Sequence, residues 1–272
     1  MISSNAPGWC SVLVPSCDKY SDLWRPFFTL FWRNWADCPF PVCLGSNELV
    51  FADERIQTIA VGADPGWSAG ARRMLGQIPT PYVLIMLDDF FLRRPVSTSR
   101  ILALLETLRR LDGHMLRLVR KRRPDFPVDG FPDVGQINNM DGAPYCVSLQ
   151  ATLWRREFLL ALLRDDETIW QFETEGSARA QDLPPGFYTV RHDALDYGRH
   201  VVQGGQWFWW DVRRHGRMNI GCDFSRRPIM SPWGEIAWRL GRVRKMALNA
   251  IPWKTRRKTR EWLRKLRNNL RK

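Results

Sequence analysis

The sequence has no long apolar run. No stretch approaches the roughly 18 apolar residues from which a membrane-spanning helix is predicted, and the first residues show no basic region followed by an apolar core, so no signal peptide is expected. The six cysteines form no Cys-x-x-Cys pair and have no zinc-like spacing with the four histidines. This pattern favours free thiols in a reducing compartment, and we expect a cytoplasmic protein.

Excess charge is missing from most of the chain. Of the 41 Lys and Arg residues, 14 lie in residues 239–272 beside a single acid, Glu261, which leaves 27 bases and 27 acids elsewhere. The net charge of +13 therefore belongs to the tail. The basic pI describes this one segment and says little about the rest of the chain.

The most informative stretch is an apolar run that stops at two acids. Residues 82–87 are apolar or aromatic, follow Pro79 and Pro81, and lead directly into Asp88 and Asp89. Such a run predicts a strand buried on both faces, as in a parallel sheet, and the acids then lie at the carboxyl edge, where open α/β folds bind ligands. Two carboxylates there suit a divalent cation that carries a phosphorylated ligand. A helix cap or a surface turn with solvated acids is the alternative.

Strands and helices alternate along the chain. Up to the acids, the pattern predicts strand, helix, strand, strand, helix and strand at 9–15, 23–35, 40–45, 56–61, 67–78 and 82–87. Beyond them it predicts helices at 100–111 and 151–163 and strands at 114–119, 145–149, 187–190 and 195–202. The loop over 120–144 is long enough to be a functional lid. We therefore expect an α/β fold with a mixed, mostly parallel sheet flanked by helices.

A basic amphipathic helical extension is expected at the C-terminal end. Two helices, over 235–250 and 255–270, are separated at Pro252, and the second places Lys and Arg opposite apolar residues such as Trp262 and Leu266. This composition is typical of an interfacial helix on anionic lipid. A helix packed on the body, a disordered solubilising tail and an RNA-binding tail are the alternatives.

Several segments resemble a known enzyme family. Residues 66–89, in which Ala71 and Arg72 lie on a helix before the acidic strand, resemble the nucleotide-sugar half of family-2-like glycosyltransferases with a GT-A fold. Residues 12–16 look like the first strand of those enzymes. Residues 148–159 look like the acceptor-side strand and helix of bacterial polysaccharide-biosynthesis transferases.

The resemblance implies a domain organisation and an activity. A GT-A-type, Rossmann-like domain would cover 9–232, with the nucleotide sugar bound by 9–92 and the acceptor by 93–232, and 233–272 would form the tail. The enzyme would move a sugar from a nucleotide-sugar donor to a glycan or polyprenyl-linked acceptor in surface polysaccharide assembly. The tail would hold it as a peripheral protein on the anionic inner face of the cell membrane.

The resemblance also implies roles on the donor side. Asp89 and Asp88 would bind Mn2+ or Mg2+, although Phe90 stands where the family's Asp-x-Asp motif has its second acid. Asp89 alone, Asp89 with a distant His192 or His200, and a weaker dependence on metal are the alternatives. The residues expected to bind the donor are Pro15, Ser16, Asp18, Arg72 and Asp88, although an Arg on a helix is more often solvated and an Asp before a helix often only forms a turn.

On the acceptor side, the family pattern places a catalytic carboxylate beyond the helix that follows Gln150. Glu173 lies close to the aromatic Trp170, and we expect it to take the proton of the acceptor hydroxyl. Glu167 and Glu175 are the alternatives, and a plain surface helix is a further one.

Two runs of similar residues have two interpretations each. The basic run 120–123 would either hold the diphosphate of a lipid-linked acceptor or be a solvated charge run. The aromatic run 207–210 would either stack on an acceptor sugar or form core, and core is favoured.

Two other functional classes compete with glycosyl transfer. A nucleotidyltransferase would use the same acidic strand on a related α/β sheet, but the N-terminal region lacks the Gly-rich basic loop expected for that class. A non-enzymatic nucleic-acid-binding protein would explain the basic tail and leave the ordered α/β pattern unexplained, so we do not expect nucleic acid as a partner.

Overall fold

The centre of the protein is a nine-stranded sheet with the strand order β3-β2-β1-β4-β9-β6-β10-β8-β7. The structure is a computed structural model that describes residues 8–121, 123–140 and 145–250, with the backbone alone for 243–250. The strands of the sheet are β1 Cys10–Val14, β2 Val42–Ser46, β3 Ile56–Ala60, β4 Tyr82–Ile85, β6 Met115–Arg117, β7 Phe126–Pro127, β8 Val134–Gln136, β9 Thr152–Arg155 and β10 Phe187–Val190.

Seven of these nine strands run in one direction. β1 pairs in parallel with β2 and β4, β2 with β3, and β6 with β10. Within the described residues, β9 and β8 run against their neighbours in the sheet. The mixed, mostly parallel α/β sheet that the sequence predicts is therefore confirmed.

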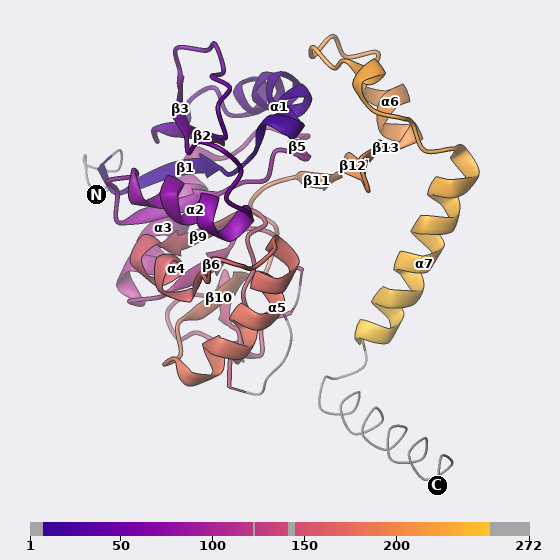
Figure 1. Ribbon diagram of the computed structural model, residues 1–272. Coiled ribbons are helices and arrows are strands. Elements are labelled where there is room, and N and C mark those ends of the chain that lie inside the picture. The colour runs from indigo at the N-terminus through magenta and orange to yellow at the C-terminus, as the bar shows by residue number, and fades with distance from the viewer. Residues whose placement is uncertain (1–7, 122, 141–144, 251–272) are drawn as a thin grey trace, which may run out of the picture.

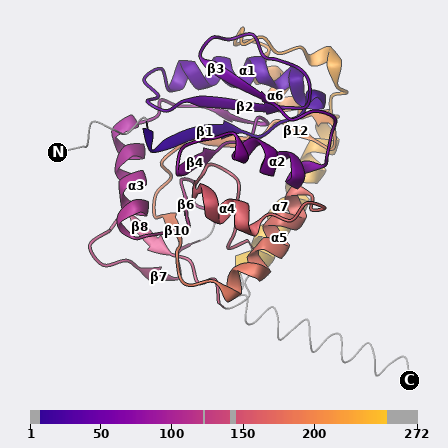
Figure 2. The same cartoon turned by 60° about the vertical axis from the view of Figure 1, so that its left-hand side comes forward.

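Helices cover both faces of the sheet (Figures 1 and 2). The helices are α1 Ser21–Asn34, α2 Trp67–Gly76, α3 Thr98–Arg110, α4 Arg156–Leu162, α5 Ile169–Arg179, α6 Trp209–His215 and α7 Pro232–Ala250. Apolar side chains of α1 and α3 form one core cluster with one face of the sheet, and those of α2, α4 and α5 form a second cluster with the other face. The sheet is thus the middle layer of three.

β4 lies near the middle of this sheet and is buried along its whole length. Tyr82 and Leu84 belong to the cluster of α1 and α3, whereas Val83 and Ile85 belong to the cluster of α2, α4 and α5. Alternate side chains of a strand point to opposite faces, so a strand covered on both sides is apolar throughout. The prediction for this stretch is confirmed.

The layer formed by α1 is dominated by aromatic side chains. Phe27, Phe28 and Phe31 pack against one another with ring centroids 5.0–6.4 Å apart. Trp35, directly after the helix, is fully buried and contacts Phe31 and Phe40. Pro26 lies inside the helix, where it removes the hydrogen bond that a backbone N–H at this position would donate to the Asp22 carbonyl. This aromatic layer covers the parallel strands that carry the site.

The predicted strand at 145–149 is wrong. The chain has an irregular course up to Ala151, and the strand β9 and the helix α4 begin only after it. Here the backbone groups are hydrogen bonded to side chains and not to a neighbouring strand. Arg117 donates to the carbonyls of Tyr145 and Cys146, and the Glu173 carboxylate accepts from Leu149 N at 3.1 Å. Tyr145 and Ala151 have positive φ, 63° and 44°, which interrupts any strand.

The C-terminal part leaves the α/β body through two small antiparallel pairs. β5 Phe90–Leu92 pairs with β11 Tyr197–His200, and β12 Val202–Gln203 pairs with β13 Gln206–Trp207. α6 and α7 follow, and α7 stands at the side of the body beyond α5 (Figure 1). α7 confirms the predicted helix over 235–250. The predicted helix over 255–270 lies outside the described residues, and none of the helices within them is long and apolar enough to cross a membrane.

Replacing Trp35 by alanine should destabilise the fold. The side chain is fully buried, and its indole Nε1 donates to Thr98 Oγ1 at 2.8 Å, so the variant loses packing and leaves an acceptor unpaired. We expect the free energy of unfolding to fall by about 3–5 kcal/mol. The matched control is Trp233→Ala, which removes a tryptophan that is 79% exposed and should change stability by less than about 0.5 kcal/mol. Urea unfolding followed by circular dichroism measures both, and equal values for the two variants would contradict the packing assigned to α1.

Candidate active site

Ser16 and Asp88 meet at the carboxyl edge because β1 and β4 are parallel neighbours. The Ser16 hydroxyl donates a hydrogen bond to Asp88 Oδ2, and it accepts one from Trp24 Nε1 at 2.7 Å. Trp24 is buried on α1 and Asp88 is buried at the end of β4. A chain of two hydrogen bonds therefore fixes the direction of the first acid.

Asp89 lies next to Asp88 in a turn that the segment 197–201 holds in place. Tyr197 Oη donates to the Leu87 carbonyl at 2.7 Å, and Val201 N donates to the Asp89 carbonyl at 2.7 Å. Within the described residues, no side chain donates a hydrogen bond to the Asp89 carboxylate, which is partly buried. The backbone of the turn is thus fixed while this carboxylate keeps its lone pairs for a ligand.

The electrostatics of the pair favour a bound positive charge. Desolvation raises the pKa of Asp88 and of Asp89, and for Asp89 the neighbouring Asp88 charge raises it further. Arg227 lowers the pKa of both carboxyls. Two adjacent carboxylates with so little water around them stay ionised only when more positive charge is nearby, and a cation can provide it.

Arg227 is a residue of this site that the sequence does not reveal. Its guanidinium pairs with Asp22 at 2.6 and 2.7 Å, donates to the Lys19 carbonyl at 2.7 Å, and lies 4.5 Å from the centre of the Tyr20 ring. These contacts fix a positive charge near the acidic pair. Arg227 and Asp22 are 205 positions apart, so no local pattern marks either of them.

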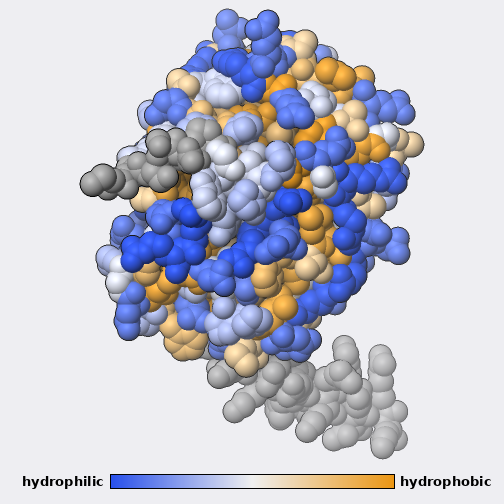
Figure 3. All heavy atoms as spheres, turned by 90° about the vertical axis from the view of Figure 1, so that its left-hand side faces the viewer, coloured by the Kyte–Doolittle hydropathy of each residue, from blue (hydrophilic) through white to orange (hydrophobic). Residues whose placement is uncertain are grey.

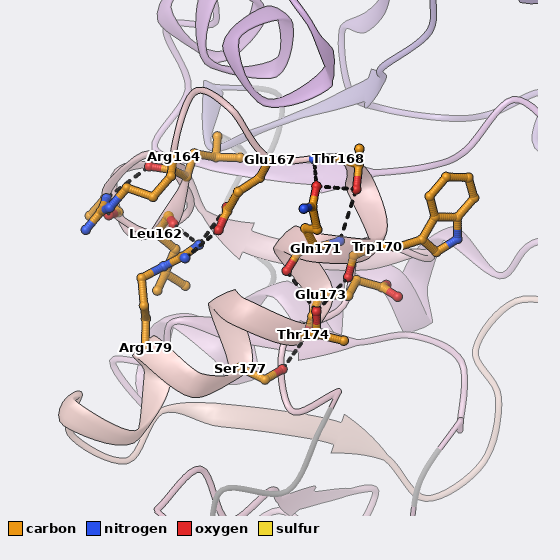
Figure 4. A network of polar contacts seen from close by, with 12 residues as sticks. Leu162, Arg164, Glu167, Thr168, Trp170, Gln171, Glu173, Thr174, Ser177 and Arg179 are labelled. Carbon is orange, nitrogen blue, oxygen red and sulfur yellow. Dashed lines mark hydrogen bonds and ion pairs between the residues drawn. The ribbon is translucent and has the colours of Figure 1, made fainter.

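Glu173 lies on α5 and is held by the irregular segment that replaces the predicted strand. Its Oε1 accepts from Leu149 N at 3.1 Å and from Ser148 Oγ at 3.2 Å. Its other oxygen, Oε2, has no hydrogen-bond partner within the described residues. Figure 4 shows Glu173 and the exposed Trp170 on the same side of α5. The carboxylate is therefore oriented and has one oxygen available.

Lys121 is influenced electrostatically by both Glu173 and Asp89. Its ammonium is near enough to both Glu173 and Asp89 for each to raise its pKa, while desolvation by the surrounding protein lowers that pKa and is the larger influence. The side chain still reaches solvent. The basic run 120–123 therefore contributes an exposed cation, Lys121, whose pKa both Glu173 and Asp89 raise.

The two alternatives to Glu173 have other surroundings. Glu167 forms an ion pair with Arg179 at 2.5 and 2.8 Å, which ties the start of α5 to its end (Figure 4). Glu175 is exposed on α5. The structure therefore gives Glu167 a structural partner and leaves Glu175 in solvent, and of the three only Glu173 has a link to the acidic pair through the described residues.

Three of the residues predicted to bind the donor have partners away from the acids. The Asp18 carboxylate accepts backbone N–H groups of residues 47–49 at 3.0–3.3 Å and so fixes the loop after β2. Arg72 donates to Asp165 Oδ1 at 2.8 Å and to carbonyls at the end of α4. Pro15 lines a small apolar hollow with Trp67 and Leu149. These contacts explain the three residues structurally, and their donor-binding role stays a prediction.

The ligands available to a metal ion at this edge are few. Within the described part of the chain, no three His, Cys, Asp or Glu side chains form a metal-binding group. His192 is exposed, and His200 Nε2 is hydrogen bonded to Gln203 Oε1 at 2.9 Å. The donor set is then the Asp89 carboxylate with Asp88 Oδ1. This set fits Mg2+ or Mn2+, since such ions are often held by one or two carboxylates with water and substrate phosphate in the other positions.

Comparison with known proteins adds little to this geometry. No protein-family model and no curated protein matches the sequence. Among solved structures, the 1–349 fragment of S. aureus TarS is 10% identical, with 66% of this chain and 60% of the fragment covered and a TM-score of 0.43. The same fragment in complex with UDP-GlcNAc is 14% identical, with 71% and 60% covered and a TM-score of 0.40.

A second group of solved structures has a different printed activity. The 2-C-methyl-D-erythritol 4-phosphate cytidylyltransferase from Thermus thermophilus is 13% identical, with 72% of this chain and 94% of that chain covered and a TM-score of 0.41. The present chain thus spans 60% of the TarS fragment and most of the cytidylyltransferase. Similarity at this level carries no argument about the reaction, so the function has to be argued from the site.

Two histidines pack around the strand that follows the acids, and both are neutral in the folded protein. His215 stacks edge-on against Phe91, with ring centroids 5.2 Å apart, and His200 contacts Phe90 at 5.6 Å. Desolvation lowers the pKa of each to about 4. In the unfolded chain they would titrate near 6.5, so the two states bind different numbers of protons below that pH.

The contribution of His215 to stability should therefore fall as the pH is lowered from about 6.5 towards 4, whereas the raised pKa values of Asp88 and Asp89 act in the opposite direction. In this range the unfolded chain binds a proton at His215 that the folded chain excludes, which costs up to about 1.4 kcal/mol per pH unit. His215→Gln should reduce this pH dependence of the free energy of unfolding. Urea unfolding at pH 5, 6 and 7 measures the slope, and the same experiment at pH 8 gives the cost of the substitution alone. An unchanged slope in the variant would show that His215 is protonated in the folded state.

Proposed function

We propose that this protein is a glycosyltransferase that moves a sugar from a nucleotide-sugar donor to a glycan or lipid-linked acceptor. The observation that carries the proposal is the placement of two groups on one side of the sheet. The buried Asp88 and the partly buried Asp89 follow the parallel strand β4, and the oriented carboxylate of Glu173 acts, like Asp89, on the pKa of Lys121. Glycosyl transfer needs a charge-neutralising site for the leaving diphosphate and a base for the acceptor, a short distance apart.

The acidic edge would hold the donor. Asp89, with Asp88 Oδ1, would bind Mn2+ or Mg2+, and the chemistry that the bound ion supplies is neutralisation of the leaving diphosphate. The Ser16 hydroxyl keeps Asp88 in a fixed direction. Arg227 adds a positive charge that Asp22 holds in position. These residues are preorganised by contacts from three distant parts of the chain, so little rearrangement is needed when the donor binds.

The acceptor would bind on the α5 side. Glu173 Oε1 is fixed by Leu149 N and Ser148 Oγ, and Oε2 is left to accept the proton of the acceptor hydroxyl. Lys121, whose pKa both Glu173 and Asp89 raise, would supply a positive charge to a phosphorylated group of either substrate. We propose a glycan or a polyprenyl-linked sugar as the acceptor, used by a peripheral protein at the inner face of the cell membrane.

Donor binding should stabilise the folded protein. A thermal-shift screen with UDP-, GDP-, TDP- and CMP-sugars, each with Mn2+ or with EDTA, should show a rise in Tm of a few degrees for one nucleotide class. A ligand at a hundred times its Kd stabilises by about 2.7 kcal/mol. EDTA and Asp89→Asn should both remove most of the rise, and Asp166→Asn, an exposed acid beyond α4, should not.

The same screen separates the alternatives. Stabilisation by CTP or another nucleoside triphosphate, with no response to any nucleotide sugar, would favour a nucleotidyltransferase. No response to any nucleotide would contradict the proposal. A full response in EDTA would leave the donor site in place and exclude the metal.

Replacing Glu173 by glutamine should abolish transfer while donor binding persists. Glutamine keeps an oxygen for Leu149 N and Ser148 Oγ but cannot take a proton, so turnover with the donor found in the screen should fall at least about 100-fold. The thermal shift with that donor should stay within a degree of wild type. Glu175→Gln on the same helix is the matched variant and should retain transfer. If Glu175→Gln abolished transfer and Glu173→Gln retained it, Glu175 would be the base. If both variants were fully active, the base would not come from α5.

A further inference from the structure

One face of α7 exposes large apolar side chains. Trp233 is 79% exposed, Leu240 65% and Ile236 38%. Residues separated by three, four and seven positions lie on one side of a helix, so these three form a single stripe. We call Trp233, Ile236 and Leu240 the outer stripe of α7.

The opposite face of α7 is already used for packing. Glu235 is buried, accepts from Trp210 N at 3.0 Å and pairs with Arg239. Trp238 packs against Phe208, with ring centroids 4.8 Å apart, and against His200 at 5.3 Å. By helical geometry, the positions 235 and 238 lie opposite the outer stripe, and 239 lies at its flank. The stripe therefore faces away from the body, and the fold does not account for it.

The surroundings of the stripe are strongly basic. From residue 209 to 242 there are seven Arg and three acids, and of the acids Glu235 is buried in its pair with Arg239. Exposed bases include Arg213, Arg214, Arg217 and Arg242. The sequence that continues from 243 adds 12 Lys and Arg against one acid. An apolar stripe with positive charge around it complements a surface that is anionic outside and apolar beneath.

The face of the protein on the far side from α7 differs. Figure 3 views the molecule from that side, where hydrophilic residues separate the apolar areas.

A polyanion such as RNA would account for the arginines but would leave the apolar stripe in water. A bilayer accounts for both features at once.

We propose that the outer stripe of α7 inserts into the headgroup region of an anionic lipid bilayer and orients the active edge toward it. Trp238 on the inner face packs on His200, and the next residue, Val201, donates to the Asp89 carbonyl. The helix that meets the bilayer is thus in direct contact with the strand that holds the acidic pair. As a means of presenting a lipid-linked acceptor, this inference rests on the proposed function; as a lipid-binding surface it is independent of it.

The test uses the full chain and vesicles of phosphatidylcholine mixed with phosphatidylglycerol, compared with phosphatidylcholine alone. Wild type should sediment with the anionic vesicles, and binding should weaken at high salt. Replacing Trp233, Ile236 and Leu240 together by serine should lower the affinity for anionic vesicles at least about tenfold, because the apolar part of the interaction is lost while every arginine remains.

The matched control replaces two exposed apolar residues elsewhere, Phe126→Ser with Met140→Ser, and should bind vesicles like wild type. The proposal would be overturned if the stripe variant bound anionic vesicles as tightly as wild type, or if wild type did not bind vesicles at all. It would also be overturned if wild type bound an RNA oligonucleotide in preference to vesicles. Unfolding by urea shows whether the stripe variant is folded. The donor-induced rise in the Tm of wild type, measured without lipid, is a separate readout. If wild type binds vesicles but shows no donor-induced rise in Tm, the donor site alone is refuted. If wild type shows the rise in Tm but binds no vesicles, the bilayer surface alone is refuted.

Discussion

The hydrogen bond from the Ser16 hydroxyl to Asp88 connects the two central parallel strands at the edge where the site lies. Trp24 donates to the same hydroxyl from α1, so the aromatic layer over the sheet also helps to set the direction of the first acid. Asp89 then projects from a turn whose backbone is held by Tyr197 and Val201. The remainder of the site is arranged around this pair of carboxylates, because their charge in a desolvated place has to be balanced from elsewhere.

That balance comes from the second half of the chain. The segment after α6 returns across the first loop and places Arg227 against Asp22 and Tyr20, and the loop after β6 supplies Lys121, which lowers the pKa of Asp89. The same return path ends in α7, whose inner face packs on His200. The acidic turn, the balancing cations and the outer stripe are therefore parts of one continuous packing arrangement, and a bilayer bound to α7 would be mechanically connected to the acids.

Prediction from the sequence failed where side chains replaced the regular partners of the backbone. Residues 145–149 have the apolar composition of a strand, but Arg117 and Glu173 take up their carbonyl and N–H groups, and the strand forms a few residues later. Glu167 and Asp18, which the sequence offers as candidates for the base and for donor binding, likewise form structural contacts, with Arg179 and with backbone N–H groups. A carboxylate in a sequence carries no sign of whether its partner will be an arginine, a backbone amide or a substrate.

The sequence by itself determined the alternation of strands and helices up to the acids, the burial of β4 on both faces, the arrival of Asp88 and Asp89 at the carboxyl edge, and the amphipathic helix at the C-terminal end. These features depend on periodicity and on local apolar content, which neighbouring residues encode. Only the tertiary structure decided that Glu167 pairs with Arg179, that Arg227 and Lys121 lower the pKa of Asp89, and which face of α7 is left exposed. Those facts depend on contacts between residues far apart in the chain, such as Asp22 with Arg227, and no local pattern contains them.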